Sequence, residues 1–61
     1  MSNLKDARWQ LASEMAAHDG LNFWASGFEF REVYLNIARQ RLQGQPQEFI
    51  DRLAAKYREE D

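Results

Sequence analysis

Between Leu21 and Leu42 the chain carries more apolar side chains than one buried helix face can hold. At the helical period these side chains fall on two lines about 140° apart. The first line holds Phe30, Val33, Tyr34, Ile37 and Ala38, and the second holds Phe28, Leu35 and Leu42 at seven-residue spacing. A helix of a small monomer usually buries one face. Two faces therefore predict two packing partners, one of them another chain.

The length of 61 residues limits the chain to a single domain, which we expect to span residues 1–61. A domain of this size buries only about 60% of the surface of its unfolded chain, so its own core is marginal. The chain has no cysteine and one histidine, His18, which excludes disulfides and gives no basis for a thiolate or histidine metal site. Oligomerisation is the remaining common way to stabilise such a chain.

The pattern predicts an all-α protein, a small bundle of two or three helices. β-branched residues are scarce, and no run of residues alternates as a strand would. Apolar residues instead recur at helical spacing in segments separated by Gly20, Gly27, Gly44 and Pro46. The predicted helices span about residues 4–17, 22 or 28–43, and 46–58.

Two boundaries follow from capping residues. Gly20 is the natural left-handed residue after the first helix, and Pro46 suits the first position of the third. The second helix has two alternative starts. Asn22 can cap a short turn that ends in a break at Gly27, or one helix can continue through Gly27 from residue 22 to residue 43.

We expect one apolar line of the second helix to pack inside the subunit and the other between subunits. The line assigned to the homodimer interface is Phe28, Leu35 and Leu42. Large aromatic side chains beside a flexible joint are good interface anchors, and the candidates for binding a further protein are Phe23, Trp24 and Phe28.

The sequence gives no support for catalysis. His18 lies at the predicted end of the first helix, where a cation is favoured by the helix dipole, and no serine has a paired base at a recognisable spacing. No glycine-rich phosphate loop is present, and we expect neither a cofactor nor a metal. No apolar run reaches the length of a membrane span, and we expect a cytoplasmic protein.

DNA binding is the alternative function. The second and third predicted helices with their short connection could form a helix-turn-helix. The would-be recognition helix, however, begins with Gln47 and Glu48 and continues with Asp51, whose charges oppose phosphate contact. The net charge of −2 also disfavours nucleic acid, so protein binding is the preferred function.

Two family resemblances agree with a binding role. The short acidic chain, its aromatic middle 23–28 and its charged helical tail 51–60 resemble small helical proteins of lambdoid phage early regions, between the exonuclease and excisionase genes. This resemblance implies a non-enzymatic accessory protein acting on host or phage proteins. A second set of segments is similar to the theta subunit of bacterial DNA polymerase III, a three-helix binding subunit: Ala25-Ser26-Gly27, Phe30-Arg31-Glu32 and Gln45-Pro46-Gln47.

Overall fold

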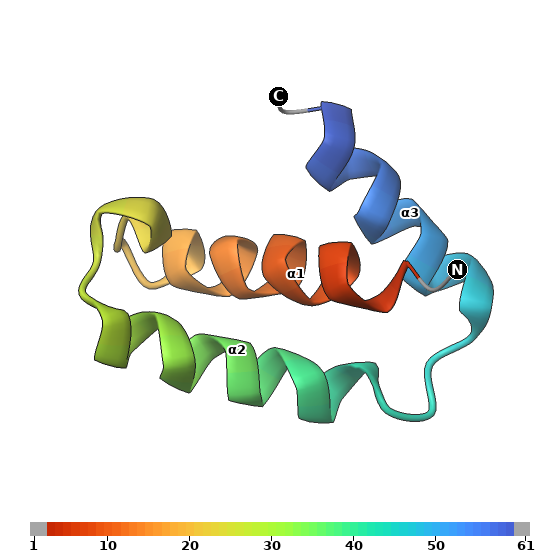
Figure 1. Cartoon of the computed structure of the whole chain (residues 1–61), viewed down its shortest axis with the longest axis horizontal. Coiled ribbons are helices and arrows are strands. Elements are labelled where there is room, and N and C mark those ends of the chain that lie inside the picture. Colours follow the sequence, from red (N-terminus) through yellow and green to blue (C-terminus); the bar gives the residue numbers. More distant parts are fainter. Residues whose placement is uncertain (1–2, 60–61) are drawn as a thin grey trace.

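The computed structural model describes residues 3–59, which fold into three α-helices and one short 3-10 turn (Figure 1). In chain order these are α1 (Leu4–His18), η1 (Phe23–Ala25), α2 (Phe28–Leu42) and α3 (Gln47–Glu59). No strand occurs within residues 3–59. The prediction of an all-α fold is confirmed.

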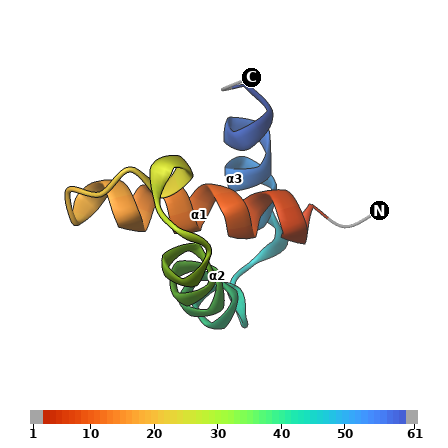
Figure 2. The ribbon, with the colours of Figure 1, turned by 60° about the vertical axis from the view of Figure 1, so that its left-hand side comes forward.

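Helix α1 is the centre of the molecule, because α2 and α3 both pack on it (Figure 1). In Figure 2 α2 is viewed nearly along its axis while α1 crosses the picture, so the two helices cross at an angle. Three alanines of α1, Ala7, Ala12 and Ala16, have no exposed surface. Such small side chains let neighbouring helices approach closely, which explains how one short helix can serve two packing partners.

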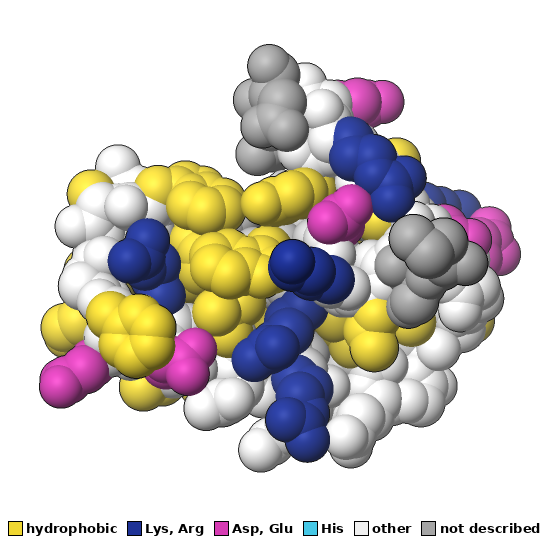
Figure 3. Space-filling model, viewed as in Figure 1, with side chains coloured by type: hydrophobic (Ala, Val, Ile, Leu, Met, Phe, Trp, Pro, Cys, Tyr) yellow, Lys and Arg dark blue, Asp and Glu magenta, His cyan; other side chains and the backbone are white. Residues whose placement is uncertain are grey.

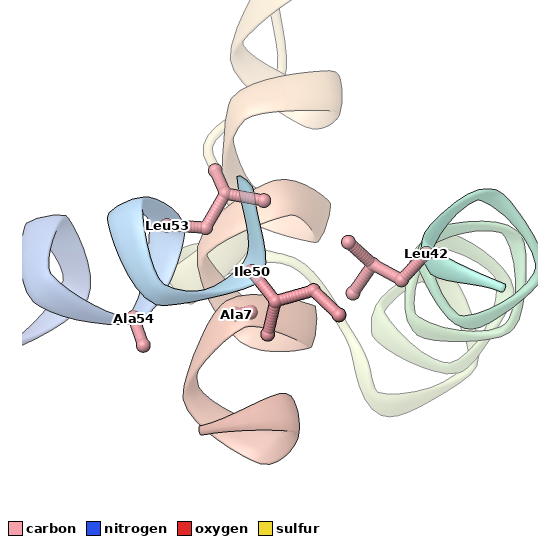
Figure 4. Close-up of a cluster of buried hydrophobic side chains, with 5 residues drawn as sticks. All are labelled: Ala7, Leu42, Ile50, Leu53 and Ala54. Carbon is pink, nitrogen blue, oxygen red and sulfur yellow. The ribbon is translucent and has the colours of Figure 1, made fainter. Parts of the chain in front are cut away.

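The apolar core consists of two clusters joined through α1. In the first, Leu42 of α2 and Ile50 and Leu53 of α3 meet over α1 (Figure 4). This cluster comprises Ala7, Leu42, Ile50, Leu53 and Ala54. The second cluster joins α1, η1 and α2 and comprises Ala12, Ala16, Phe23, Leu35 and Ala38. The inner face of α2 therefore contributes to both clusters.

The end of α1 depends on Gly20. Its φ of +80° lies in the left-handed region, as predicted. The Leu21 N–H donates to the Ala16 carbonyl at 2.9 Å, and the Gly20 N–H donates to the Ala17 carbonyl at 3.0 Å. This pair of hydrogen bonds is the Schellman motif, which satisfies carbonyls left open at a helix end and turns the chain toward η1.

The chain breaks at Gly27, so the alternative of one helix over residues 22–43 is wrong. The Asn22 side-chain oxygen accepts a hydrogen bond of 3.1 Å from the Trp24 N–H and caps η1. Gly27 is extended, with ψ of 164°, and is the N-cap of α2. The reason for the break is local. The Asn22 side chain caps the single turn η1, and the extended backbone of Ser26 and Gly27 separates this turn from α2.

Helix α3 begins one residue later than predicted. The Pro46 carbonyl accepts hydrogen bonds from the N–H groups of Phe49 and Ile50, at 3.0 and 3.3 Å. Pro46 is therefore the residue before the helix, and Gln47 is its first residue.

Candidate functional site

The structure divides the predicted dimer interface between core and surface. Leu35 and Leu42 are only 4% and 2% exposed, whereas Phe28 is 70% exposed. The assignment of Leu35 and Leu42 to a contact with another chain is wrong, because both are covered by helices of their own chain. Together with Ala38 they have the i, i+3, i+7 spacing of one helix face, and that face packs on α1. Phe28 alone of the three remains available to a partner.

Three residues of the other apolar line of α2 are exposed, whereas Ala38 of that line is buried in the core and Tyr34 is half-buried. Phe30, Val33 and Ile37 are 60%, 54% and 38% exposed. They follow the same i, i+3, i+7 spacing on the side of α2 turned away from the core. We call these three residues the outer stripe. The prediction of two apolar faces is therefore only partly right. Leu35 and Leu42 of the line expected to be the interface lie in the core, and Phe30, Val33 and Ile37 of the other line are open to solvent.

A groove between α1 and α2 borders the outer stripe. It has a volume of about 320 Å³ and includes Ile37 of the stripe. Its other apolar lining residues are Leu11, Met15 and Tyr34, and its charged or titratable lining residues are Glu14, His18, Asp19 and Arg41. The apolar surface thus extends from α2 onto α1.

Tyr34 lines this groove, and its hydroxyl group contacts the residue after the end of α1. The hydroxyl donates a hydrogen bond of 2.8 Å to the Asp19 carboxylate. This hydrogen bond, together with burial and the negative charge of Asp19, raises the pKa of Tyr34 above its ordinary value of 10.0. The phenol therefore stays neutral and holds α2 against the end of α1.

The three predicted partner-binding aromatics have three different environments. Phe23 is 2% exposed and meets Trp9 and Trp24 edge-to-face, at centroid distances of 5.7 and 5.1 Å. Its assignment to a partner surface is wrong, because these rings and the alanines of α1 enclose it. Trp24 stacks on Trp9 at 5.6 Å yet is 51% exposed, and Phe28 is more exposed still. Trp24 and Phe28 therefore remain on the surface.

A cationic pocket lies on another part of the surface, where the N-terminal half of α1 meets α2. It has a volume of about 350 Å³ and is lined by Leu4, Lys5, Arg8 and Arg39. Figure 3 shows a line of lysine and arginine side chains that runs from the centre of one face to its lower edge, beside a large hydrophobic area. Within residues 3–59 none of the three cations of this pocket forms a salt bridge.

Sequence reasoning missed this cationic pocket. Arg39 lies more than thirty residues after Lys5 and Arg8 in the sequence. It is also near the C-terminal end of a predicted helix, where the helix dipole favours a positive charge, so its presence pointed to no binding site. The only local signal is the three-residue spacing of Lys5 and Arg8, which places them on neighbouring positions of one helix surface.

The charges of α3 mostly contact other residues of the chain. Lys56 pairs with Glu14 at 3.2 Å, and Arg58 pairs with Asp6 at 3.1 Å, so both cations tie α3 to α1. At the start of α3, Asp51 accepts hydrogen bonds from the side-chain amides of Gln47 and Asn3, each at 2.9 Å. These hydrogen bonds, with a smaller contribution from the Arg58 charge, lower the pKa of Asp51.

No family model matches the chain, and no curated protein and no solved structure matches it either. Within residues 3–59 no helix has both the length and the apolar character needed to cross a membrane. The same part of the chain contains no group of three or more His, Asp or Glu side chains placed to hold a metal ion. The exposed apolar side chains and the cationic pocket are the surface features that call for a functional explanation.

Proposed function

We propose that this protein is a non-catalytic protein-interaction module that forms a homodimer through the outer stripe of α2. The observation that carries the proposal is the exposure of Phe30, Val33 and Ile37 at helical spacing on one side of one helix. Large exposed apolar patches on a protein surface often mark interaction sites.

The energetic argument concerns apolar area. Full burial of a Phe, Val or Ile side chain contributes about 1.5–3 kcal/mol relative to full exposure. Phe30 and Val33 expose more than half of their surface, so most of this free energy is still available to a contact. A twofold dimer buries the same stripe of both copies at once, and the adjoining groove enlarges the contact.

Analytical ultracentrifugation tests this proposal with a matched pair of variants. Both Val33→Glu and Phe28→Glu introduce a carboxylate at an exposed apolar position of α2, but only Val33 belongs to the outer stripe. We expect the wild type and Phe28→Glu to dimerise and Val33→Glu to remain monomeric. Circular dichroism checks that both variants keep the helical fold.

A monomeric wild type at about 100 µM would contradict the proposed dimer, because that concentration lies far above the Kd of a stable pair. A dimer lost in Phe28→Glu and kept in Val33→Glu would place the contact on the opposite side of α2 and overturn the assignment of the outer stripe.

The likeness to phage early-region proteins supports an accessory role of this kind, in which the module regulates host or phage proteins in the cytoplasm. The alternative, a DNA-binding regulator, has less support. The first turns of α3 carry Glu48 and Asp51, which a recognition helix would bring toward phosphates. The cationic pocket lies between α1 and α2, not on α3.

A further inference from the structure

We propose that the cationic pocket of Leu4, Lys5, Arg8 and Arg39 binds carboxylate side chains of an acidic, partly apolar segment of a partner protein. This inference goes beyond the proposed dimer. It concerns a different surface, because Arg39 and the outer stripe lie on different sides of α2 at the helical period.

The first argument is unneutralised charge. Lys5, Arg8 and Arg39 line one pocket, no acidic residue lines it, and none of the three has an ion pair within residues 3–59. Arg52, Lys56 and Arg58 each pair with a carboxylate, whereas Arg31 and Arg41 also form no ion pair within residues 3–59 but do not line this pocket. Three like charges that converge on one pocket repel one another, and a bound anion relieves this repulsion.

The second argument is preorganisation of Arg8. Its Nε donates a hydrogen bond of 3.0 Å to the Leu35 carbonyl, which fixes the guanidinium group against α2. The two terminal amino groups make no further hydrogen bond within residues 3–59. A guanidinium held in this way loses little entropy when it binds a carboxylate through two parallel hydrogen bonds.

The third argument concerns the class of partner. Phe28 and Arg39 lie on the same side of α2, three turns or about 16 Å apart, and Phe28 is 70% exposed. Leu4, which lines the pocket, is 44% exposed. Leu4 beside the cations and Phe28 further along the same side of α2 match a partner segment that carries both carboxylates and apolar residues.

Nucleic acid fits this surface less well. Glu32 lies two turns before Arg39 on the same side of α2 and forms no salt bridge within residues 3–59. A DNA duplex carries one negative charge for about every 1.7 Å of its length. A duplex bound at the pocket would therefore also place phosphates beside the Glu32 carboxylate, which has the same charge. A protein segment can place carboxylates over the pocket and apolar side chains elsewhere.

The test uses a fluorescein-labelled peptide of about 20 residues, with leucines every three or four positions and glutamate at all others. Fluorescence anisotropy compares the wild type with Arg39→Glu and with the control Arg41→Glu. The two variants change the net charge equally on the same helix, but Arg41 lines the other groove. We expect Arg39→Glu to weaken binding by about tenfold or more and Arg41→Glu by about twofold or less. Equal weakening by both variants would show an unspecific charge effect and overturn the proposal.

Amide chemical shifts of the unlabelled wild-type complex provide a test that needs no variant. We expect the largest shift changes at Leu4, Lys5, Arg8 and Arg39. No binding at about 1 mM peptide, or changes confined to the groove beside Arg41, would overturn the proposal. Tighter binding of a duplex DNA, lost in Arg39→Glu, would assign the pocket to nucleic acid and also overturn it.

Discussion

The Arg8 side chain of α1 donates a hydrogen bond from Nε to the backbone carbonyl of Leu35, in the middle of α2, at 3.0 Å. Leu35 also places its side chain in the core between these helices. One residue of α2 thus receives both an apolar and a polar contact from α1. The polar contact fixes how the two helices are placed along each other, because a hydrogen bond is directional in a way that apolar packing is not.

Loss of this hydrogen bond should destabilise the protein. A hydrogen bond from a charged donor contributes about 1.5–3 kcal/mol, so we expect Arg8→Ala to lower the free energy of unfolding by about this amount. Urea denaturation followed by circular dichroism measures the change. Lys5→Ala is the control, because the Lys5 side chain is exposed and forms no hydrogen bond or ion pair within residues 3–59, and we expect a change within about 0.5 kcal/mol. Equal losses in both variants would contradict a specific role of the Arg8 hydrogen bond.

Core and surface positions of α2 should respond differently to truncation. Leu35→Ala removes a side chain that is 4% exposed, and such a change costs about 2–5 kcal/mol. A chain of 61 residues has a total stability of about 3–9 kcal/mol, so we expect the variant to lose a large fraction of its stability at 25 °C. Val33→Ala, at a position that is 54% exposed, should lower monomer stability by less than about 1 kcal/mol. Thermal melts at low protein concentration, where a dimer does not contribute, measure both changes, and a larger loss for Val33→Ala would contradict the assigned core.

The two glycines that flank η1 should differ in their tolerance of a side chain. Neither has a neighbouring atom within 4 Å of an added Cβ, so the backbone conformation decides the outcome. We expect Gly20→Ala to cost about 1 kcal/mol, because φ is +80° there. Gly27→Ser should be neutral or stabilising by a few tenths of a kcal/mol, because serine is a favoured N-cap residue and the backbone at Gly27 is extended. Urea titrations measure both, and the reverse order would contradict the observed backbone.

Acidification should weaken the attachment of α3 through Asp51. Its pKa in the folded chain lies below the ordinary value of 3.8, because the side chains of Gln47 and Asn3 donate hydrogen bonds to its carboxylate. A lowered pKa stabilises the folded chain at pH values above 3.8, and this stabilisation is lost as the pH falls through the folded-state value. We expect the Asp51→Asn variant to be less stable than the wild type at neutral pH and the difference to shrink as the pH falls below 3.8 and through the lower folded-state pKa. Thermal melting at a series of pH values checks this, and a difference independent of pH would contradict it.

The sequence predicted the helices well because their boundaries are set locally. Gly20 and Asn22 act through hydrogen bonds to residues two to five positions away, so their roles can be read from neighbouring residues. The choice between the two apolar faces of α2 could not be made in this way. It depends on whether α1 packs against Leu35 and Leu42 or against Val33 and Ile37, and both faces have helical spacing.

The candidate surfaces were predictable only in part. The exposure of Trp24 and Phe28 agrees with the expected aromatic surface. Phe23, in contrast, is enclosed by Trp24 and by Trp9 of α1, and the contact with Trp9 forms only when the chain folds. The cationic pocket depends on the packing of the N-terminal half of α1 against α2, so Arg39 meets Lys5 and Arg8 only in the folded chain.

The central position of α1 also limits which helices can unfold while the rest of the structure remains. Most of the contacts that α2 and α3 make with other elements are made with α1, whose alanines Ala7, Ala12 and Ala16 are fully buried. Detachment of α3 leaves the second cluster between α1, η1 and α2 in place, whereas the loss of α1 removes the support of every other element at once. Partial opening therefore keeps α1 together with at least one of its two partner helices, and α1 is the last helix to lose its structure.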